Sequence, residues 1–307
     1  MAKQKIKWLL FHEPAELFIR TAEDFQKHLD KLTNNKFEIE ILTIEKYQDK
    51  YCDGIICDPF TELKEGRVQV SQLYSEILGD FDATNFYALS MPYLFRDHDH
   101  ASKVFEGEIG QDLFKYLHAK TNVRGLSYTY SGGYRCTASE TPIKSIADFA
   151  GKKMLRSRNP IHADMIDMVG GEKVFDTDGP TAEVVQTTLP RYHVDASKSQ
   201  KYVTDTKHSM YLTAILMNDN FWNSLSAEDQ ASMKTAGLNA SRTERKKSVA
   251  DADFIKENRA KQEELGIDTM IELSDSEIEK LSNIWAPLYD KYENFFGDDI
   301  LNKIKNS

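Results

Sequence analysis

The stretch from residue 226 to residue 266 constrains the fold most, because it runs for about forty positions with almost no helix-breaking residue. Ser226 and Asp229 match a capping box at its start, and Gly266 matches a C-terminal stop. A helix of this length exceeds the ordinary size in a globular protein. The sequence therefore predicts one long helix that crosses two domains.

The chain begins with the order strand, helix, strand. Residues 6–11 form a largely apolar run, and residues 36–44 alternate apolar and charged side chains. Between them the apolar residues recur at helical spacing, at Phe18, Ala22, Phe25, Leu29 and Leu32. This order is typical of an α/β sheet.

A chain of 307 residues has the length of about two domains. We expect domain I to comprise residues 1–125 plus 210–250, and domain II to comprise residues 126–209 plus 251–307. The composition, with 40% hydrophobic residues, permits a sizeable core in each.

The net charge of -10 argues against nucleic acid or an anionic membrane as a partner, since phosphate binding requires a basic surface. No apolar run reaches the length of a membrane span, so we expect no stable membrane insertion. The opening "MAKQKIKWLLF" does not resemble a signal peptide. Two interpretations follow, a cytosolic protein or an exported one whose leader has been replaced.

Three cysteines do not make a complete disulfide framework. The spacing in "CDGIIC", residues 52–57, does not match a zinc pattern, so we expect free or buried thiols and no metal site. No P-loop or nucleophile elbow is present, so the sequence predicts no cofactor and gives little support to an enzyme.

Three arginines gather in the middle of this acidic chain. Arg135 follows "SGGY", a glycine interruption of a predicted strand. Arg156 and Arg158 lie on a strand predicted over residues 152–158, after which "NP" opens a helix. A further short strand is expected around Val194. Three guanidinium groups in so short a stretch indicate contact with an anion.

Several segments, taken in order, carry a resemblance to a known family. They are "MPYLFRDHDHASKVFEG", "GGYRCTASETPIKSIADFAGKKM", "LPRYHVDAS" and "FWNSLSAEDQASM". Together they resemble the solute-binding proteins of TRAP transporters, the type that binds C4-dicarboxylates, sialic acid or ectoine. The resemblance covers nearly the whole chain and rests on order and spacing, since no single motif is specific.

The resemblance implies a two-domain periplasmic-binding-protein-like α/β fold, with a ligand cleft between the domains and a long domain-crossing helix. It implies a monomer that captures a small organic acid and delivers it to the TRAP membrane permease subunits. It also implies a periplasmic location, with the signal peptide absent from this chain. Neither composition nor spacing identifies the ligand.

The resemblance also implies particular ligand-binding residues. Arg135 matches the family's Gly-x-Arg position, where the arginine contacts the ligand carboxylate in many members. The family's second arginine falls on Leu155, and Arg156 follows one residue later. Because one residue of slip turns a side chain to the opposite face of a strand, Arg156 reaches the ligand only if the strand carries a bulge or a one-residue insertion. We expect such a bulge.

Further candidates come from both predicted domains. His12 and Glu13, in "FHEPAE", follow the first strand and resemble the His-Glu of ectoine-binding members. His208 matches a recurring family histidine that we interpret as structural. The remaining ligand-binding candidates, each taken from strand parity or register, are Arg158, Gln72, Tyr74 and Ser199.

Two alternative functions stay open. The same fold serves as the ligand-binding sensor module of a receptor, and Glu13 with His12 offers an acid and a base to an enzyme. Neighbouring genes for TRAP membrane subunits, or for a sensor kinase, would discriminate between transport and sensing.

The resemblance predicts that the two domains close on the ligand by hinge motion. We expect the radius of gyration in small-angle scattering to fall when a saturating ligand is added. An unchanged radius at saturation would contradict this prediction.

Overall fold

The computed structural model describes residues 3–12, 15–55, 57–175, 182–297 and 299–307. The chain forms two compact units. Unit 1 comprises residues 1–83, 104–130 and 212–247, and unit 2 comprises residues 84–103, 131–211 and 248–307. From the sequence we expect residues 84–103 in domain I, whereas the structure groups them with unit 2. The expected limits of domains I and II as functional domains stay a prediction.

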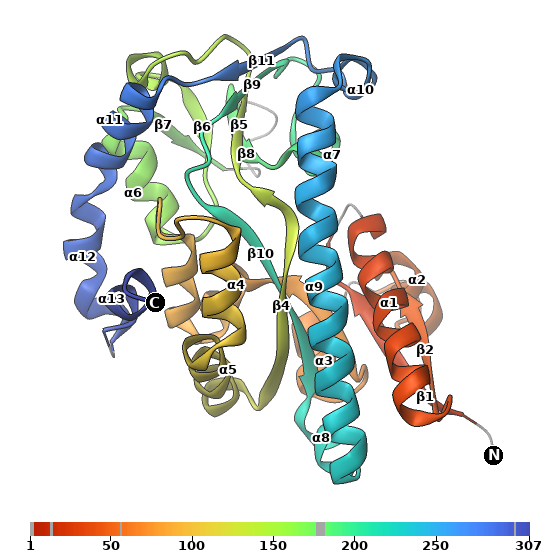
Figure 1. Ribbon diagram of the computed structural model, residues 1–307. Coiled ribbons are helices and arrows are strands. Elements are labelled where there is room, and N and C mark those ends of the chain that lie inside the picture. Colours follow the sequence, from red (N-terminus) through yellow and green to blue (C-terminus); the bar gives the residue numbers. More distant parts are fainter. Residues whose placement is uncertain (1–2, 13–14, 56, 176–181, 298) are drawn as a thin grey trace. The chain divides into compact units, whose positions relative to one another are not determined.

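Unit 1 begins with the βαβ arrangement that the sequence predicts (Figure 1). Its first part consists of β1 (Gln4–Leu10), α1 (Ala15–Thr33), β2 (Phe37–Leu42), α2 (Ile44–Tyr51), α3 (Pro59–Lys64), β3 (Val70–Tyr74) and the 3-10 helix η1 (Ser75–Phe81). The later segments of unit 1 supply α5 (Glu108–Thr121), α8 (Asp219–Ser224), and most of β4 (Val123–Tyr134), β10 (Met210–Asn218) and α9 (Ala227–Glu257).

Unit 2 contains shorter strands and more helices. Its elements are η2 (Thr84–Ser90), most of α4 (His98–Glu106), β5 (Cys136–Ser139), η3 (Ile146–Phe149), β6 (Lys153–Leu155), α6 (Pro160–Met168), β7 (Glu172–Val174), β8 (Val184–Thr187), η5 (Leu189–Arg191), α7 (Tyr192–Asp195), β9 (Tyr202–Asp205), α10 (Arg259–Leu265), β11 (Thr269–Glu272), α11 (Asp275–Trp285), α12 (Pro287–Phe296) and α13 (Ile300–Lys305).

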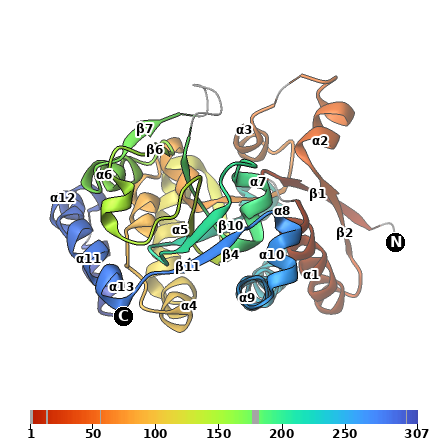
Figure 2. The same ribbon diagram turned by 90° about the horizontal axis from the view of Figure 1, so that it is seen from above.

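Within the described residues the strands form two sheets. The five-stranded sheet has the order β2-β1-β3-β10-β4, and the six-stranded sheet has the order β11-β9-β5-β8-β6-β7. β1 pairs with β2 and β3 in parallel, whereas β10 runs antiparallel to β3. In unit 1, α1 lies on one face of β1 and β2, and α2 and α3 lie on the other (Figure 2).

The core of unit 1 is aromatic. Trp8 and Phe25 are fully buried and meet edge to face, with ring centroids 5.1 Å apart. Arg20 on α1 donates two hydrogen bonds of 2.6 Å to the buried carboxylate of Glu244 on α9. This paired contact fixes α9 against α1, because a carboxylate buried without compensation would destabilise the unit.

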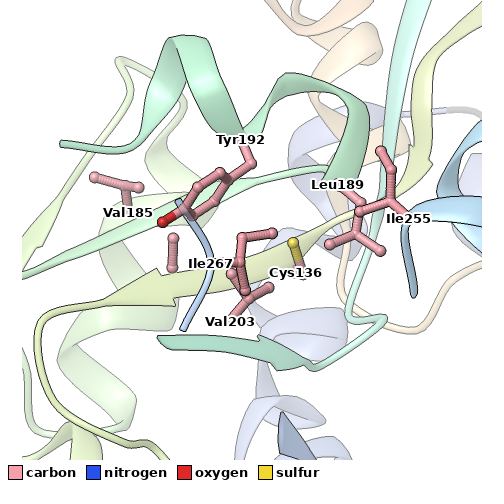
Figure 3. Close-up of a cluster of buried hydrophobic side chains, with 8 residues drawn as sticks. Cys136, Val185, Leu189, Tyr192, Val203, Ile255 and Ile267 are labelled. Carbon is pink, nitrogen blue, oxygen red and sulfur yellow. The ribbon is translucent and has the colours of Figure 1, made fainter. Parts of the chain in front are cut away.

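The core of unit 2 includes an apolar cluster between the sheet and the helices that follow β8. It consists of Cys136, Ala138, Val185, Leu189, Tyr192, Val203, Ile255 and Ile267, most of them shown in Figure 3. The cluster joins β5, β8 and β9 to α7 and the end of α9. On another side of the unit, Trp285 of α11 donates a hydrogen bond to the carbonyl of Met165 in α6.

The long helix begins where the sequence predicts but ends earlier. The amide of Asp229 donates to the Ser226 hydroxyl at 3.1 Å, which confirms the predicted start. Asn258 interrupts the helix with a non-helical backbone, and its side chain caps α10 by accepting from the amide of Lys261. The prediction of one continuous helix to Gly266 is therefore wrong for the last turns. α9 still passes from unit 1 into unit 2.

The cysteines differ from expectation. Cys52 and Cys57 form a disulfide, so the prediction of free thiols is wrong for this pair. Their spacing of five residues is no recognised disulfide signature, and the turn after α2 brings them together. Cys136 is the free cysteine within the described residues, and burial raises the pKa of its thiol well above the ordinary value.

The disulfide and the burial of Cys136 predict how many thiols a labelling reagent should modify. The native, unreduced protein should react with no equivalent of a thiol reagent at pH 8, because Cys136 is buried and protonated. Unfolding without reductant should release one thiol, and unfolding with reductant should release three. Two or more reactive thiols in the unreduced, unfolded protein would contradict the disulfide.

Candidate functional site

One edge of the unit 2 sheet collects polar and charged residues. Cys136 at the start of β5 pairs with Thr187 at the end of β8, because these strands are antiparallel. β6 runs parallel to β8, with Met154 opposite Val184. The residues just before β5, just after β6 and just after β8 therefore lie at the same edge. The edge of a sheet where strands end is where α/β proteins commonly bind ligands.

A glycine pair shapes the backbone that leads into this edge. Gly132 and Gly133 have φ values of +91° and +85°, a region that other residues rarely adopt. A Cβ atom added to Gly132 would lie 2.2 Å from the hydroxyl oxygen of Thr188. Only glycine therefore fits here. Two residues later the amide of Arg135 donates to the carbonyl of Ser209 at 2.8 Å, which fixes the position of this arginine.

Arg135 is buried, with only 4% of its surface exposed. The carbon of its guanidinium group lies 3.6 Å from the ring centroid of Tyr211, a cation–π distance. A stacked guanidinium keeps its N–H donors at the edge of its plane, where they match the two oxygens of a carboxylate. Contact between Arg135 and a ligand stays a prediction.

A second buried arginine, Arg191, was missed by the sequence analysis. It forms a fork with Asp195, through hydrogen bonds of 3.0 Å and 2.6 Å, and its guanidinium carbon lies 5.1 Å from the Tyr211 ring centroid. The Thr187 hydroxyl also donates to Asp195. The predicted strand around Val194 is wrong, because these residues form α7. An arginine and an aspartate four residues apart are typical of an ion pair on a helix, and this spacing could have indicated one here.

His208 lies buried beside these arginines and is hydrogen bonded through both ring nitrogens. Nδ1 contacts the Thr206 hydroxyl at 2.7 Å, and Nε2 contacts Oε1 of Gln186 at 3.1 Å. Because Oε1 can only accept, Nε2 carries the proton. Burial, then the positive charges of Arg135 and His162, lower the pKa of His208 well below its ordinary value. The ring is therefore neutral, in keeping with a structural role.

Arg156 lies just beyond the strand that was expected to contain it. β6 ends at Leu155 with continuous pairing to β7, so the predicted bulge is not formed. Leu155 packs against the apolar cluster. The Arg156 amide donates to the carbonyl of Val174, and its guanidinium lies 4.5 Å from the ring centroid of Phe175. Because Arg156 lies beyond the end of β6, the alternation of side chains along a strand does not determine the direction of its side chain.

Two other candidates of unit 2 lie on the surface. Arg158 is exposed in the loop before α6. Ser199 is also exposed, and its hydroxyl donates to Oε1 of Glu140 at 2.6 Å. Ligand contact by Arg156, Arg158 and Ser199 stays a prediction.

The candidates of unit 1 meet at the carboxyl ends of β1 and β3. Leu10 pairs with Gln72, and the ring of His12 stacks on Tyr74 at a centroid distance of 3.7 Å. The amide nitrogen of Gln72 donates to Thr213, whereas its buried Oε1 has no hydrogen-bond partner among the described residues. Oε1 is thus available to a hydroxyl or N–H donor. Glu13 lies outside the described residues.

Unit 1 also contains a pocket of about 410 Å³ between α5, β4, α8 and α9. Its walls include the stacked rings of Phe114 and Tyr128, together with Trp222. Its buried cation, Arg245, is paired with Glu106 and donates to the carbonyl of Tyr128. Because this charge is compensated internally, we assign the pocket no ligand.

In the described part of the chain, no group of three or more histidine, cysteine, aspartate or glutamate side chains is arranged to hold a metal ion. Among the same residues, no helix is long and apolar enough to cross a membrane.

Known proteins resemble this chain along most of its length. Residues 12–186 and 181–294 match the family described as "Bacterial extracellular solute-binding protein, family 7". The chain is 24% identical over 295 residues to the C4-dicarboxylate-binding periplasmic protein DctP of Rhodobacter capsulatus, covering 92% of this chain and 85% of that protein.

Solved structures share the fold. One is a TRAP periplasmic solute-binding protein from Sulfurospirillum deleyianum with bound succinate, at a TM-score of 0.82, 20% identity and 99% coverage of both chains. Another is from a Polaromonas species, bound to D-erythronate, at a TM-score of 0.82, 21% identity and coverage of 99% of this chain and 98% of that one. The predicted α/β architecture is therefore confirmed.

The contact between Arg135 and Tyr211 can be tested without a ligand. A double-mutant cycle of Arg135→Met and Tyr211→Leu should give a coupling of about 1 kcal/mol in the free energy of unfolding. The same cycle with Tyr211→Phe should give a coupling near zero, because phenylalanine keeps the ring face. Additive effects of the Arg135→Met and Tyr211→Leu changes would show that the cation–π contact does not form.

Proposed function

Because this chain belongs to family 7 of the bacterial extracellular solute-binding proteins, we propose that it captures a small organic acid for a TRAP membrane permease. The proposal covers the ligand class, the permease partner, a periplasmic location and a monomeric state. It is supported by the relatives, among them a C4-dicarboxylate-binding periplasmic protein and structures with bound succinate and D-erythronate.

The placement of Arg135 is the observation that supports a carboxylate as the ligand class. It is buried, held through its backbone by Ser209 and stacked on Tyr211, so its direction is set before any ligand arrives. Preorganisation of this kind lowers the entropy lost on binding. A carboxylate is the small anion that best fits the planar fork of a guanidinium. Arg135 therefore serves as the carboxylate anchor.

Unit 1, taken by itself, presents groups that suit an organic acid with hydroxyl groups. The buried Oε1 of Gln72 accepts a hydrogen bond from a hydroxyl group, which sugar acids and hydroxy acids carry. The stacked rings of His12 and Tyr74 offer an apolar surface to a carbon chain.

A periplasmic location agrees with the disulfide between Cys52 and Cys57, since disulfides persist mainly in oxidising compartments. The protein acts in this proposal as a binding protein and not as an enzyme. Both ring nitrogens of the neutral His208 are engaged in internal hydrogen bonds, so neither is open to a substrate as an acid or a base.

A thermal-shift screen over small organic acids tests the function directly. A ligand that binds only the folded state raises the melting temperature by mass action. Succinate and D-erythronate belong in the screen with matched amines and alcohols. Stabilisation by alcohols or amines, and by no acid, would contradict the proposed ligand class.

Replacing Arg135 by lysine tests the anchor. Lysine keeps the charge but loses the fork, so Arg135→Lys should weaken binding of the best acid by about thirtyfold, equivalent to about 2 kcal/mol. Its melting temperature should stay near that of the parent. Calorimetry provides the affinities, with Arg259→Lys on the exposed face of α10 as control. Parental affinity of the Arg135 variant would remove this residue from the site.

A further inference from the structure

The loop between β6 and α6 ends in a buried amide that the proposed function does not yet use. Asn159 is 2% exposed and is the N-cap of α6. Its Oδ1 accepts from the amide of Ile161 at 3.0 Å, which settles the orientation of the side-chain amide, because the nitrogen could not accept there. Its Nδ2 has no hydrogen-bond partner among the described residues.

This nitrogen stands at the helix N-terminus. Oδ1 and Nδ2 belong to one small planar group, so an Nδ2 whose companion oxygen meets Ile161 also lies beside the first turn of α6. A helix N-terminus carries partial positive charge and attracts anions. A buried donor left without an acceptor costs free energy, so Nδ2 requires a partner of that kind.

The surroundings carry further positive charge. Arg156 and Arg158 lie in the same loop. Inside the turn, the Ser157 hydroxyl contacts Nδ1 of His162 at 3.1 Å and accepts from the amide of Asn159. No acidic side chain lies between residues 152 and 163. The field at this helix end therefore favours an anion.

The helix end and Arg135 face the same part of unit 2. Arg135 directly precedes β5, and the loop that leads to Asn159 follows β6; these two strands flank β8 and are thus separated by two strand spacings, about 10 Å. The positive charges of Arg135 and His162 both act on the ring of His208. One small ligand can therefore reach both groups.

We propose that the N-terminus of α6 binds a second anionic group of the ligand, with Nδ2 of Asn159 as its hydrogen-bond donor. The inference rests on the proposed function, in which Arg135 holds the first carboxylate. Asn159 then determines specificity: it selects acids that carry a second carboxylate or a phosphate over acids that carry one charge.

Two substitutions separate this role from the capping of α6. Asn159→Asp keeps a capping oxygen of equal quality but replaces the donor by a negative charge. Asn159→Ser keeps a capping oxygen and replaces the amide donor by a shorter hydroxyl group. Asn258→Asp is the matched control, since Asn258 caps α10 in the same unit through the amide of Lys261.

Calorimetry with matched acids provides the measurement. The pairs are succinate with butyrate, glutarate with valerate, and 3-phosphoglycerate with glycerate. The first acid of each pair carries two anionic groups, and the second carries one. The parent protein should bind the first acid of at least one pair about a hundredfold more tightly than the second. Preference within the first two pairs identifies a second carboxylate, and preference within the third identifies a phosphate.

The Asn159 variants should then lose affinity for one kind of acid and keep it for the other. Asn159→Asp should lose about a hundredfold in affinity for the preferred doubly charged acid, and Asn159→Ser about tenfold, while both change the affinity for its singly charged partner less than threefold. Asn258→Asp should change neither. Melting temperatures of all three variants should remain close to that of the parent.

Two results would overturn the inference alone: equal affinity of the parent for both members of every pair that binds, or parental affinity of Asn159→Asp for the preferred acid. Equal losses for singly and doubly charged acids would also overturn it, because they would indicate a structural role. Failure of every acid to bind the parent protein would overturn the proposed function together with the inference.

Discussion

The burial of one positive charge governs the arrangement of unit 2. Removing a guanidinium from water is expensive unless it is compensated. Around Arg135 the fold supplies a ring face from Tyr211 and a backbone fixed at Ser209. Arg191, the next cation on the same ring, is neutralised by Asp195. Neutral His208 completes the arrangement, since a charged imidazole there would repel the guanidinium group of Arg135.

The six-stranded sheet brings polar groups from several strands to one edge. Because β5 is antiparallel to β8 and β6 is parallel to it, one edge receives a strand start and two strand ends. The turn through Gly132 brings Arg135 to that edge, and α6 begins there. Side chains far apart in the sequence become neighbours through strand pairing alone. Apolar packing beneath the edge, around Cys136 and Leu189, holds the strands in register (Figure 3).

Periodicity predicted the fold well and predicted the site less well. Long patterns, such as α1 and the start of α9, depend on local chemistry and are visible in the sequence. The break at Asn258, the end of β6 at Leu155 and the helix around Val194 depend on tertiary pairing, which a short segment does not encode. Arg135 was proposed as a ligand contact through its motif, and the structure shows it buried against Tyr211. Arg191 was missed because a helical i,i+4 pair was read as a strand.

The neutrality of His208 also limits the tolerance of the fold to acid. In the unfolded chain a histidine takes up a proton below a pH of about 6.5. In the folded chain the pKa of His208 lies well below that value, so over the interval between the two the unfolded state binds more protons. The free energy of unfolding therefore falls as the pH drops through this interval. His208, buried near Arg135, therefore sets part of the pH range over which the folded protein is stable.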